Sequence, residues 1–189
     1  MIGHNAKLYE DLTHILVTRE QIAEAVDRLG AKITEDYQGK ELLMVAILKG
    51  SVMFFSDLLR AVDLPVQTEF MAVSSYGAST RTSGVVNLVK DLTADITGMH
   101  VLIVEDIVDS GMTLSYLKKY LSTRGAASIR IATLLDKPER RRVDLKADYF
   151  CFTIPDEFVV GYGLDYAEKY RNLPDIGVLD PRIYTAQEE

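Results

Sequence analysis

The feature that most constrains this chain is a pair of short segments that are apolar throughout, Leu42–Leu48 and Val101–Val104. A strand with one face in water alternates apolar and polar residues, so strands as apolar as these must be covered on both faces. Ser128–Leu135 is predicted to be a third core strand. The expected fold class is therefore α/β, with a mostly parallel sheet flanked by helices.

Helices are predicted between these strands, and they begin near Thr18, at Val52 and at about Thr113. Thr18 and Gln21 form a capping-box pattern, and Ser51 is expected to cap the second helix. The repeated order of strand, helix and strand implies right-handed βαβ units.

Two further strands are predicted at Val66–Ser74 and Val85–Lys90. Between them, Ser75–Gly84 holds serine, threonine, glycine and a single large ring, Tyr76. This segment is too polar to pack and is rich in hinge residues, so it is predicted to be a mobile loop.

A length of 189 residues suits one domain, 1–189, with a small appendage. The core is expected at about 36–154. Beyond Pro155 the pattern changes to short strands and turns, so the two chain ends, about 1–35 and 155–189, are predicted to pack together as a hood over the sheet.

Composition excludes several classes of function. The net charge is −7, and Arg140-Arg141-Arg142 is the one notable basic run, which argues against nucleic acid as a partner. The N-terminus lacks a signal-peptide pattern, and no apolar run approaches the length of a membrane span. A cytoplasmic location without membrane contact is expected, with Cys151 as an inert core thiol.

The segment after Val104 is the richest in chemistry. In open α/β sheets, ligands bind at the carboxyl ends of the strands, and this segment follows such an end. Ser110, Gly111 and Thr113 stand where the next helix begins. Exposed amides and the helix dipole favour a phosphate there, and the glycine lets the backbone come close.

The acidic residues of the same segment suit a sugar. Glu105 and Asp106 repel phosphate, and their natural partners are the hydroxyls of a ribose or a magnesium ion. Asp109 lies between the two and could accept a proton from an attacking base. The alternative is that Ser110 only caps the helix and the acids are solvated. The crowding of three carboxylates, a glycine and two hydroxyls into nine positions favours a ligand site.

This segment resembles the phosphoribosyl diphosphate motif of the type I phosphoribosyltransferases, and the whole chain resembles their hypoxanthine-guanine subgroup. Four separated segments carry the resemblance between roughly residues 42 and 179: Leu48–Gly50, Glu105–Thr113, Leu135–Arg140 and Phe158–Tyr166.

The resemblance implies an enzyme of purine salvage. It would transfer the 5-phosphoribosyl group from phosphoribosyl diphosphate to hypoxanthine and/or guanine, giving IMP or GMP and pyrophosphate. It also implies Mg²⁺ as cofactor and a homodimer or homotetramer. Residues Ser110 to Thr113, with Gly111 and Met112, would cradle the 5-phosphate. Asp109 would face N7 of the purine as proton acceptor.

Other roles also follow from the resemblance. Lys137 would donate to the 6-oxo group, Phe158 would stack on the base, and the carbonyl of Val159 would read its edge. A cation at this position also selects against adenine, whose amino group is a donor. Asp165, near the base, would hold magnesium together with Glu105 and Asp106.

Lys49 and Gly50, in a loop with a cis peptide after Leu48, would meet the pyrophosphate together with Arg171. Ser75 and Tyr76 would belong to a lid over the reacting centre. One departure is Asp175, where bacterial relatives are expected to have an aromatic residue.

Three other functions compete with this one. A receiver-type signalling domain should carry its acidic pair on the first strand, not at residue 105. A non-catalytic regulator that binds nucleic acid should have a basic face, which this acidic chain lacks. An enzyme for adenine or orotate is disfavoured by Lys137 and Phe158.

Overall fold

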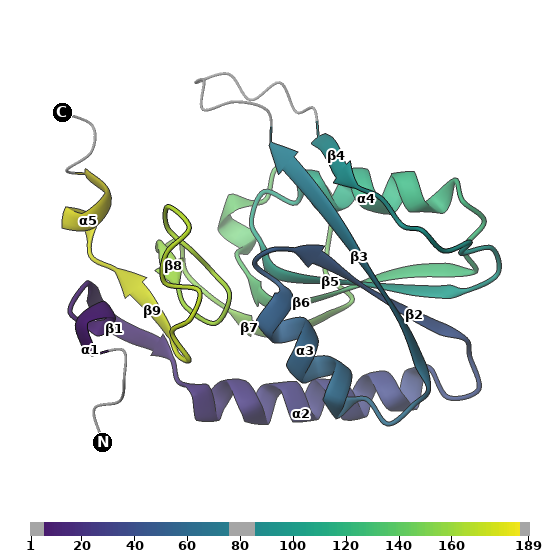
Figure 1. Cartoon of the computed structure of the whole chain (residues 1–189), viewed down its shortest axis with the longest axis horizontal. Coiled ribbons are helices and arrows are strands. Elements are labelled where there is room, and N and C mark those ends of the chain that lie inside the picture. The colour runs from purple at the N-terminus through teal and green to yellow at the C-terminus, as the bar shows by residue number, and fades with distance from the viewer. Residues whose placement is uncertain (1–5, 76–85, 186–189) are drawn as a thin grey trace.

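A computed structural model describes residues 6–75 and 86–185. Its centre is a six-stranded sheet of order β4-β3-β2-β5-β6-β7, parallel except for the antiparallel β3–β4 pair (Figure 1). The predicted fold class is confirmed. The strands are β2 (Leu42–Leu48), β3 (Val66–Ser75), β4 (Val86–Lys90), β5 (His100–Val108), β6 (Ser128–Asp136) and β7 (Tyr149–Thr153).

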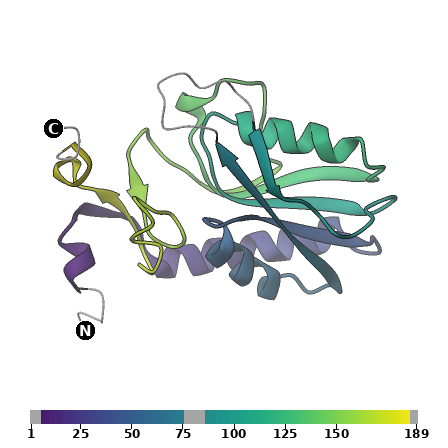
Figure 2. The ribbon, with the colours of Figure 1, turned by 45° about the horizontal axis from the view of Figure 1, so that its top comes forward.

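Helices cover both faces of this sheet, as the wholly apolar strands require. On one face α2 (Arg19–Asp36) and α3 (Val52–Ala61) pack against each other, and α4 (Met112–Ser122) lies on the opposite face (Figure 2). Successive side chains of β2 alternate between the two cores. Met44 packs in the cluster on the α2 and α3 side, whereas Val45 packs in the cluster that includes α4.

The two predicted helix caps have different outcomes. The capping box at Thr18 is present: its hydroxyl accepts from the amide of Gln21, and the Thr18 amide donates to Gln21 Oε1 over 2.9 Å. The prediction for Ser51 is wrong. Its backbone is helical rather than extended, and its hydroxyl donates to the carbonyl of Ile47 over 2.6 Å, so it ties the helix start to β2.

The acidic segment is not wholly a loop, because β5 continues through Val108. Its pairing with β2 stops at Val104, but its pairing with β6 continues to Val108 opposite Asp136. Glu105 and Asp106 therefore lie on a strand that has lost one neighbour. The sheet backbone holds these two carboxylates at the edge of the space that β2 leaves open.

A second sheet joins distant parts of the chain. Its antiparallel order is β1-β9-β8, and α1 (Ala6–Tyr9) and α5 (Pro181–Thr185) lie beside it (Figure 1). We call these elements, with residues 161–175, the hood. Helix α2, which falls largely in the range 1–35 predicted for the hood, packs on α3 and β7 instead. The strands are β1 (Leu12–Val17), β8 (Val159–Val160) and β9 (Ile176–Leu179).

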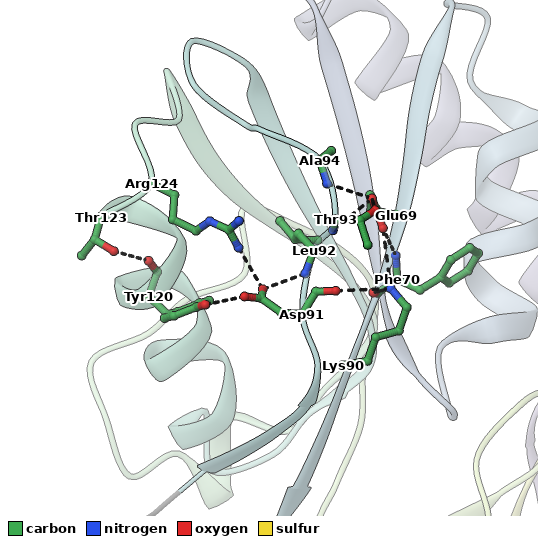
Figure 3. Close-up of polar contacts among 10 residues, drawn as sticks. All are labelled: Glu69, Phe70, Lys90, Asp91, Leu92, Thr93, Ala94, Tyr120, Thr123 and Arg124. Carbon is green, nitrogen blue, oxygen red and sulfur yellow. Dashed lines mark hydrogen bonds and ion pairs between the residues drawn. The ribbon is translucent and has the colours of Figure 1, made fainter.

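Two carboxylates fix the connection between β4 and β5 (Figure 3). Glu69 Oε1 accepts hydrogen bonds from the amides and hydroxyl of residues 93 and 94, and Asp91 accepts from Tyr120 over 2.5 Å and from Arg124 over 2.9 Å. The hydrogen bond from the Thr93 hydroxyl is the main reason that the pKa of Glu69 is lowered. The antiparallel edge strand is thereby anchored to α4.

Three further predictions concern membrane spans, the cysteine and the predicted lid. Among the described residues, no helix is long and apolar enough to cross a membrane. Cys151 is partly buried against the core, and burial raises the pKa of its thiol to about 12, in agreement with an inert thiol. Of the predicted lid, Ser75 ends β3, whereas Tyr76 and the positions up to 85 lie outside the described residues.

Candidate active site

The site begins where β2 leaves the sheet. The peptide bond between Leu48 and Lys49 is cis, as predicted. The next residue, Gly50, lies against the side chain of Asp106: a methyl group there would come within 1.7 Å of Oδ2. A larger residue would displace the Asp106 carboxylate, so the loop after β2 and the acidic end of β5 are in direct contact.

A cavity of about 290 Å³ lies beside the N-terminus of α4. Ser110, Gly111 and Thr113 line it together with Glu105 and Asp109. Gly111 is the N-cap of α4 with φ +79°, a conformation that favours glycine. The free amides and dipole of the helix N-terminus suit a phosphate, and the hydroxyls add donors. Met112 is not among the residues that line this cavity, and its amide donates to Ser110 Oγ over 3.4 Å.

Two carboxylates, Glu105 and Asp106, lie next to each other at the end of β5, and the charge of Arg171 acts on Asp106. Burial, then the charge of Asp106, raises the pKa of Glu105 well above its usual range. Burial also raises the pKa of Asp106, although its Oδ1 accepts from the Ile107 amide over 2.8 Å. Glu105 Oε2 is buried and has no hydrogen-bond partner within residues 6–75 and 86–185. Such an oxygen requires a proton, a hydroxyl group or a cation.

A second cavity, of about 350 Å³, adjoins the first, and Asp109 lines both. Its other predicted residues are Asp106, Lys137, Phe158, Val159 and Asp165. Lys137 is only 7% exposed, so it is not the solvated lysine of an ordinary turn. Phe158 is 42% exposed, which is unusual for a core phenylalanine and leaves its ring accessible to a ligand.

The Lys137 ammonium points away from bulk water. Its Nζ donates to the carbonyl of Glu157 over 2.5 Å and lies 3.8 Å from Asp156 Oδ1. Burial lowers the pKa of this lysine, and the charges of Asp109 and Asp156 oppose the shift. The group is a buried hydrogen-bond donor, held at the wall of the second cavity.

The residues predicted to meet pyrophosphate lie in a charge network at the mouth of the site. Glu168 Oε2 is 3.0 Å from Lys49 Nζ and 3.5 Å from an Arg171 nitrogen. Arg171 also pairs with Asp165 at 2.8 Å and donates to the carbonyl of Gly163 over 2.8 Å. The structure thus brings Lys49, Arg171 and Asp165 together through Glu168, which the sequence analysis did not single out.

Two arginines near Asp109 were also missed as site residues. Arg140 Nε lies 2.9 Å from Asp109 Oδ1, and the same guanidinium pairs with Asp156. Arg141 donates to the Asp109 carbonyl over 2.7 Å and pairs with Asp136. The run of three arginines was visible in the sequence. Its direction toward the active site depends on the turn after β6, which no local pattern reveals.

The departure at Asp175 has a structural explanation. Its side chain is buried and accepts from the Arg19 amide over 2.7 Å, from the Arg19 guanidinium over 2.8 Å and from the Tyr9 hydroxyl. Burial opposes ionisation of this carboxyl, but the hydrogen bonds from Arg19 and Tyr9 outweigh it and lower the pKa. Asp175 therefore ties the two chain ends together and leaves both cavities untouched.

Comparison with known proteins agrees with this geometry. The family model described as phosphoribosyl transferase domain matches residues 14–167. The hypoxanthine-guanine phosphoribosyltransferase of Streptococcus pneumoniae is 54% identical over 178 residues, which cover 94% of this chain and 99% of the relative. The enzyme of the same description from Mycobacterium tuberculosis is 52% identical over an alignment that covers 96% of this chain and 94% of the relative.

A solved structure supports the same assignment. The hypoxanthine phosphoribosyltransferase of Staphylococcus aureus, in a tetragonal crystal form, superposes with a TM-score of 0.93 at 49% identity and covers 96% of this chain and 99% of its own. The fold and site thus define a phosphoribosyl transferase. Within that class, the chain belongs to the hypoxanthine-guanine phosphoribosyltransferases.

Proposed function

We propose that this chain transfers the 5-phosphoribosyl group of phosphoribosyl diphosphate to hypoxanthine or guanine, releasing pyrophosphate and giving IMP or GMP. The observation that carries the proposal is the position of Asp109, on the wall shared by the two cavities. One cavity has the backbone amides and hydroxyls that suit a phosphate, and the other has a buried ammonium and an open aromatic ring.

The sugar substrate is held from the end of β5. Ser110, Gly111, Met112 and Thr113 bind the 5-phosphate through the backbone amides and hydroxyls of the α4 N-terminus, and the Met112 amide exchanges its contact with Ser110 Oγ for the phosphate. Glu105 and Asp106 accept hydrogen bonds from the ribose hydroxyls, a role supported by the buried Glu105 Oε2, which has no hydrogen-bond partner among the described residues.

The base is held across the second cavity. Lys137 donates to the 6-oxo group, Phe158 stacks on the ring, and the carbonyl of Val159 accepts from the purine edge, with Asp165 beside it. When N9 of the base forms its bond to the anomeric carbon, the bond to pyrophosphate breaks and the N7 proton passes to Asp109. Arg140, at 2.9 Å, must then release the Asp109 carboxylate.

The leaving group is held at the mouth of the site. Lys49, the backbone of Gly50, and Arg171 receive the pyrophosphate, which replaces Glu168 as their anionic partner. Positioning both substrates and neutralising the leaving charge supply most of the catalysis in such a displacement.

Magnesium fits the donor set at this site. Glu105, Asp106 and Asp165 offer the hard oxygen atoms that this ion prefers, and one buried oxygen of Glu105 lacks a partner in the described chain. No group of three such ligands is preassembled within residues 6–75 and 86–185. Together with the phosphates of the substrate, these residues would hold the ion, which would neutralise negative charge on the pyrophosphate.

We expect a homodimer or homotetramer. Light scattering behind a gel-filtration column measures this assembly directly.

The activity is tested by a spectrophotometric assay with phosphoribosyl diphosphate, Mg²⁺ and each of five bases: hypoxanthine, guanine, xanthine, adenine and orotate. We expect turnover with hypoxanthine or guanine and none with adenine, whose 6-amino group cannot accept from Lys137. Absence of turnover with every oxopurine would contradict the proposal. Replacing Mg²⁺ with excess chelator should abolish the reaction.

A further inference from the structure

The ring of Phe158 has two different surroundings. On one side it lines the second cavity, which we call the base cavity because it is proposed to hold the purine. It also stacks on Tyr184, with ring centroids 5.2 Å apart and planes inclined by 28°, and it meets the edge of Tyr166 at 5.7 Å. Neither tyrosine is among the residues that line this cavity, so both contact the phenylalanine from outside it.

The two tyrosines come from separate parts of the hood and contact each other at 6.2 Å. Tyr184 lies on α5, which follows β9 at the far side of the hood (Figure 1). The residue before α5 is fixed to the turn between α1 and β1, because the Asp180 amide donates to the carbonyl of Asp11 over 2.9 Å. The last described helix thus reaches the base cavity through one aromatic stack.

The contacts of these two tyrosines restrict the motion of the Phe158 ring. An exposed phenylalanine rotates about two side-chain bonds, and a ligand that stacks on it must pay the entropy of holding the ring still. Rings packed against it from outside the cavity restrict that motion before the ligand arrives. Offset aromatic contacts also favour one orientation of the ring over others.

We propose that Tyr184 is a positioning residue for the purine base, which it orients by holding the Phe158 ring from outside the base cavity. The inference rests on the proposed function, in which the base stacks on Phe158. We expect Tyr184 to act mainly on the base half of the reaction, because its ring contacts Phe158 and because no described residue of the hood lines the cavity beside the α4 N-terminus.

The test compares Tyr184→Leu and Tyr184→Phe with the wild-type enzyme in steady-state kinetics. Leucine keeps apolar volume but removes the ring, and phenylalanine keeps the ring. For Tyr184→Leu we expect KM for hypoxanthine to rise about three- to tenfold, with KM for phosphoribosyl diphosphate unchanged. Tyr184→Phe should keep the wild-type KM for hypoxanthine.

The matched control is Tyr116→Leu on α4. It also removes one ring of a stacked pair, because the ring centroids of Tyr116 and Tyr120 lie 6.2 Å apart. It should leave KM for hypoxanthine unchanged. A Phe158→Leu background supplies a double-mutant cycle: if Tyr184 acts through Phe158, adding Tyr184→Leu there has no further effect on KM.

The outcomes are distinguishable. Equal rises in both KM values, no rise in either, or failure of Tyr184→Phe to keep the wild-type KM would overturn the inference. If Tyr184→Leu does not fold, Tyr184→Met is used in the same comparison, and failure of both to fold assigns Tyr184 to the hood's stability instead. Absence of wild-type turnover would refute the proposed function rather than this inference.

Discussion

The six-stranded sheet and the hood are stabilised in different ways. The sheet is held by apolar side chains on both faces, and its strands β2 and β5 contain runs of fully buried aliphatic residues. The hood contains a buried aspartate and a tyrosine-rich cluster. All four non-glycine residues with positive φ in the described chain lie there: Tyr162, Ala167, Glu168 and Tyr170.

This difference separates two tasks. The sheet provides a rigid edge on which charged groups can be buried without loss of the fold, and the phosphate cavity and Asp109 lie on that edge. The hood uses strained backbone conformations and polar contacts to shape the second cavity. It also holds Arg171, one of the cations that we propose to bind pyrophosphate. Substitutions at the sheet edge should therefore affect catalysis, whereas substitutions of the hood's positive-φ glycines and of its buried aspartate should first affect stability.

The largest effect is expected for Asp109→Ala. Loss of the proton acceptor should lower kcat about 10²- to 10⁴-fold, whereas the Kd for phosphoribosyl diphosphate and the melting temperature change little. Steady-state kinetics and calorimetric binding measure the two quantities.

The control for this substitution is Asp156→Ala, which removes the other carboxylate partner of Arg140. It should cost far less in kcat. Equal losses in kcat and in substrate affinity for Asp109→Ala would point to a structural role and remove the distinction between the two regions.

Gly163→Ala should be the most destabilising of the hood substitutions. A methyl group at Gly163 would lie 2.0 Å from the carbonyl of Gly50, and φ is +101°. The expected loss is about 2 to 3 kcal/mol in the free energy of unfolding, from steric overlap and backbone strain. Urea denaturation measures it.

Gly39→Ala is the matched control, since Gly39 also has positive φ, +74°, but has open space around it. It should cost only about 1 kcal/mol. Equal losses for the two glycines would show that the contact between the hood and the β2 loop contributes nothing.

A smaller effect is expected for Asp175→Asn, which removes the charge that Arg19 and Tyr9 contact. The free energy of unfolding should fall by about 2 kcal/mol at pH 7. Because folding lowers the pKa of Asp175, its contribution is fully present above the unfolded value of about 3.9 and is lost as pH falls through the folded value.

The difference in stability between wild type and Asp175→Asn should therefore shrink below about pH 4. Asp27→Asn, on the exposed side of α2, serves as the control and should match wild type throughout. A constant difference down to pH 2 would mean that the ionised carboxyl is not what holds the chain ends.

Predictability from sequence follows the same division. The bounds of β2 were predicted to the residue, since an apolar run between polar ends suffices to define a strand covered on both faces. The phosphate segment could be derived from chemistry, because its residues are consecutive. The end of β5 was placed too early, as the extra pairing with β6 depends on the path of another strand.

The hood was not accessible to the same reasoning. Glu168 and Tyr184 contact residues that are far away in the sequence, Lys49 and Phe158. Outside the hood, the contact between Arg140 and Asp109 likewise depends on the turn after β6. Lys137 and Phe158 were assigned through the resemblance, since an isolated lysine or phenylalanine carries no pattern of its own. Long-range polar pairing has no periodicity that a single sequence reveals.

The order in which the two cavities are encoded has a consequence for synthesis of the chain. The phosphate cavity is lined entirely by residues 47–114, whereas the base cavity needs residues up to Asp165 and a sheet that pairs residue 12 with residue 179. A chain emerging from the ribosome therefore acquires all the residues of its sugar cavity long before it can shape the cavity for the base. Until β9 pairs with β1, the second substrate has no finished place to bind, and the activated sugar has no acceptor.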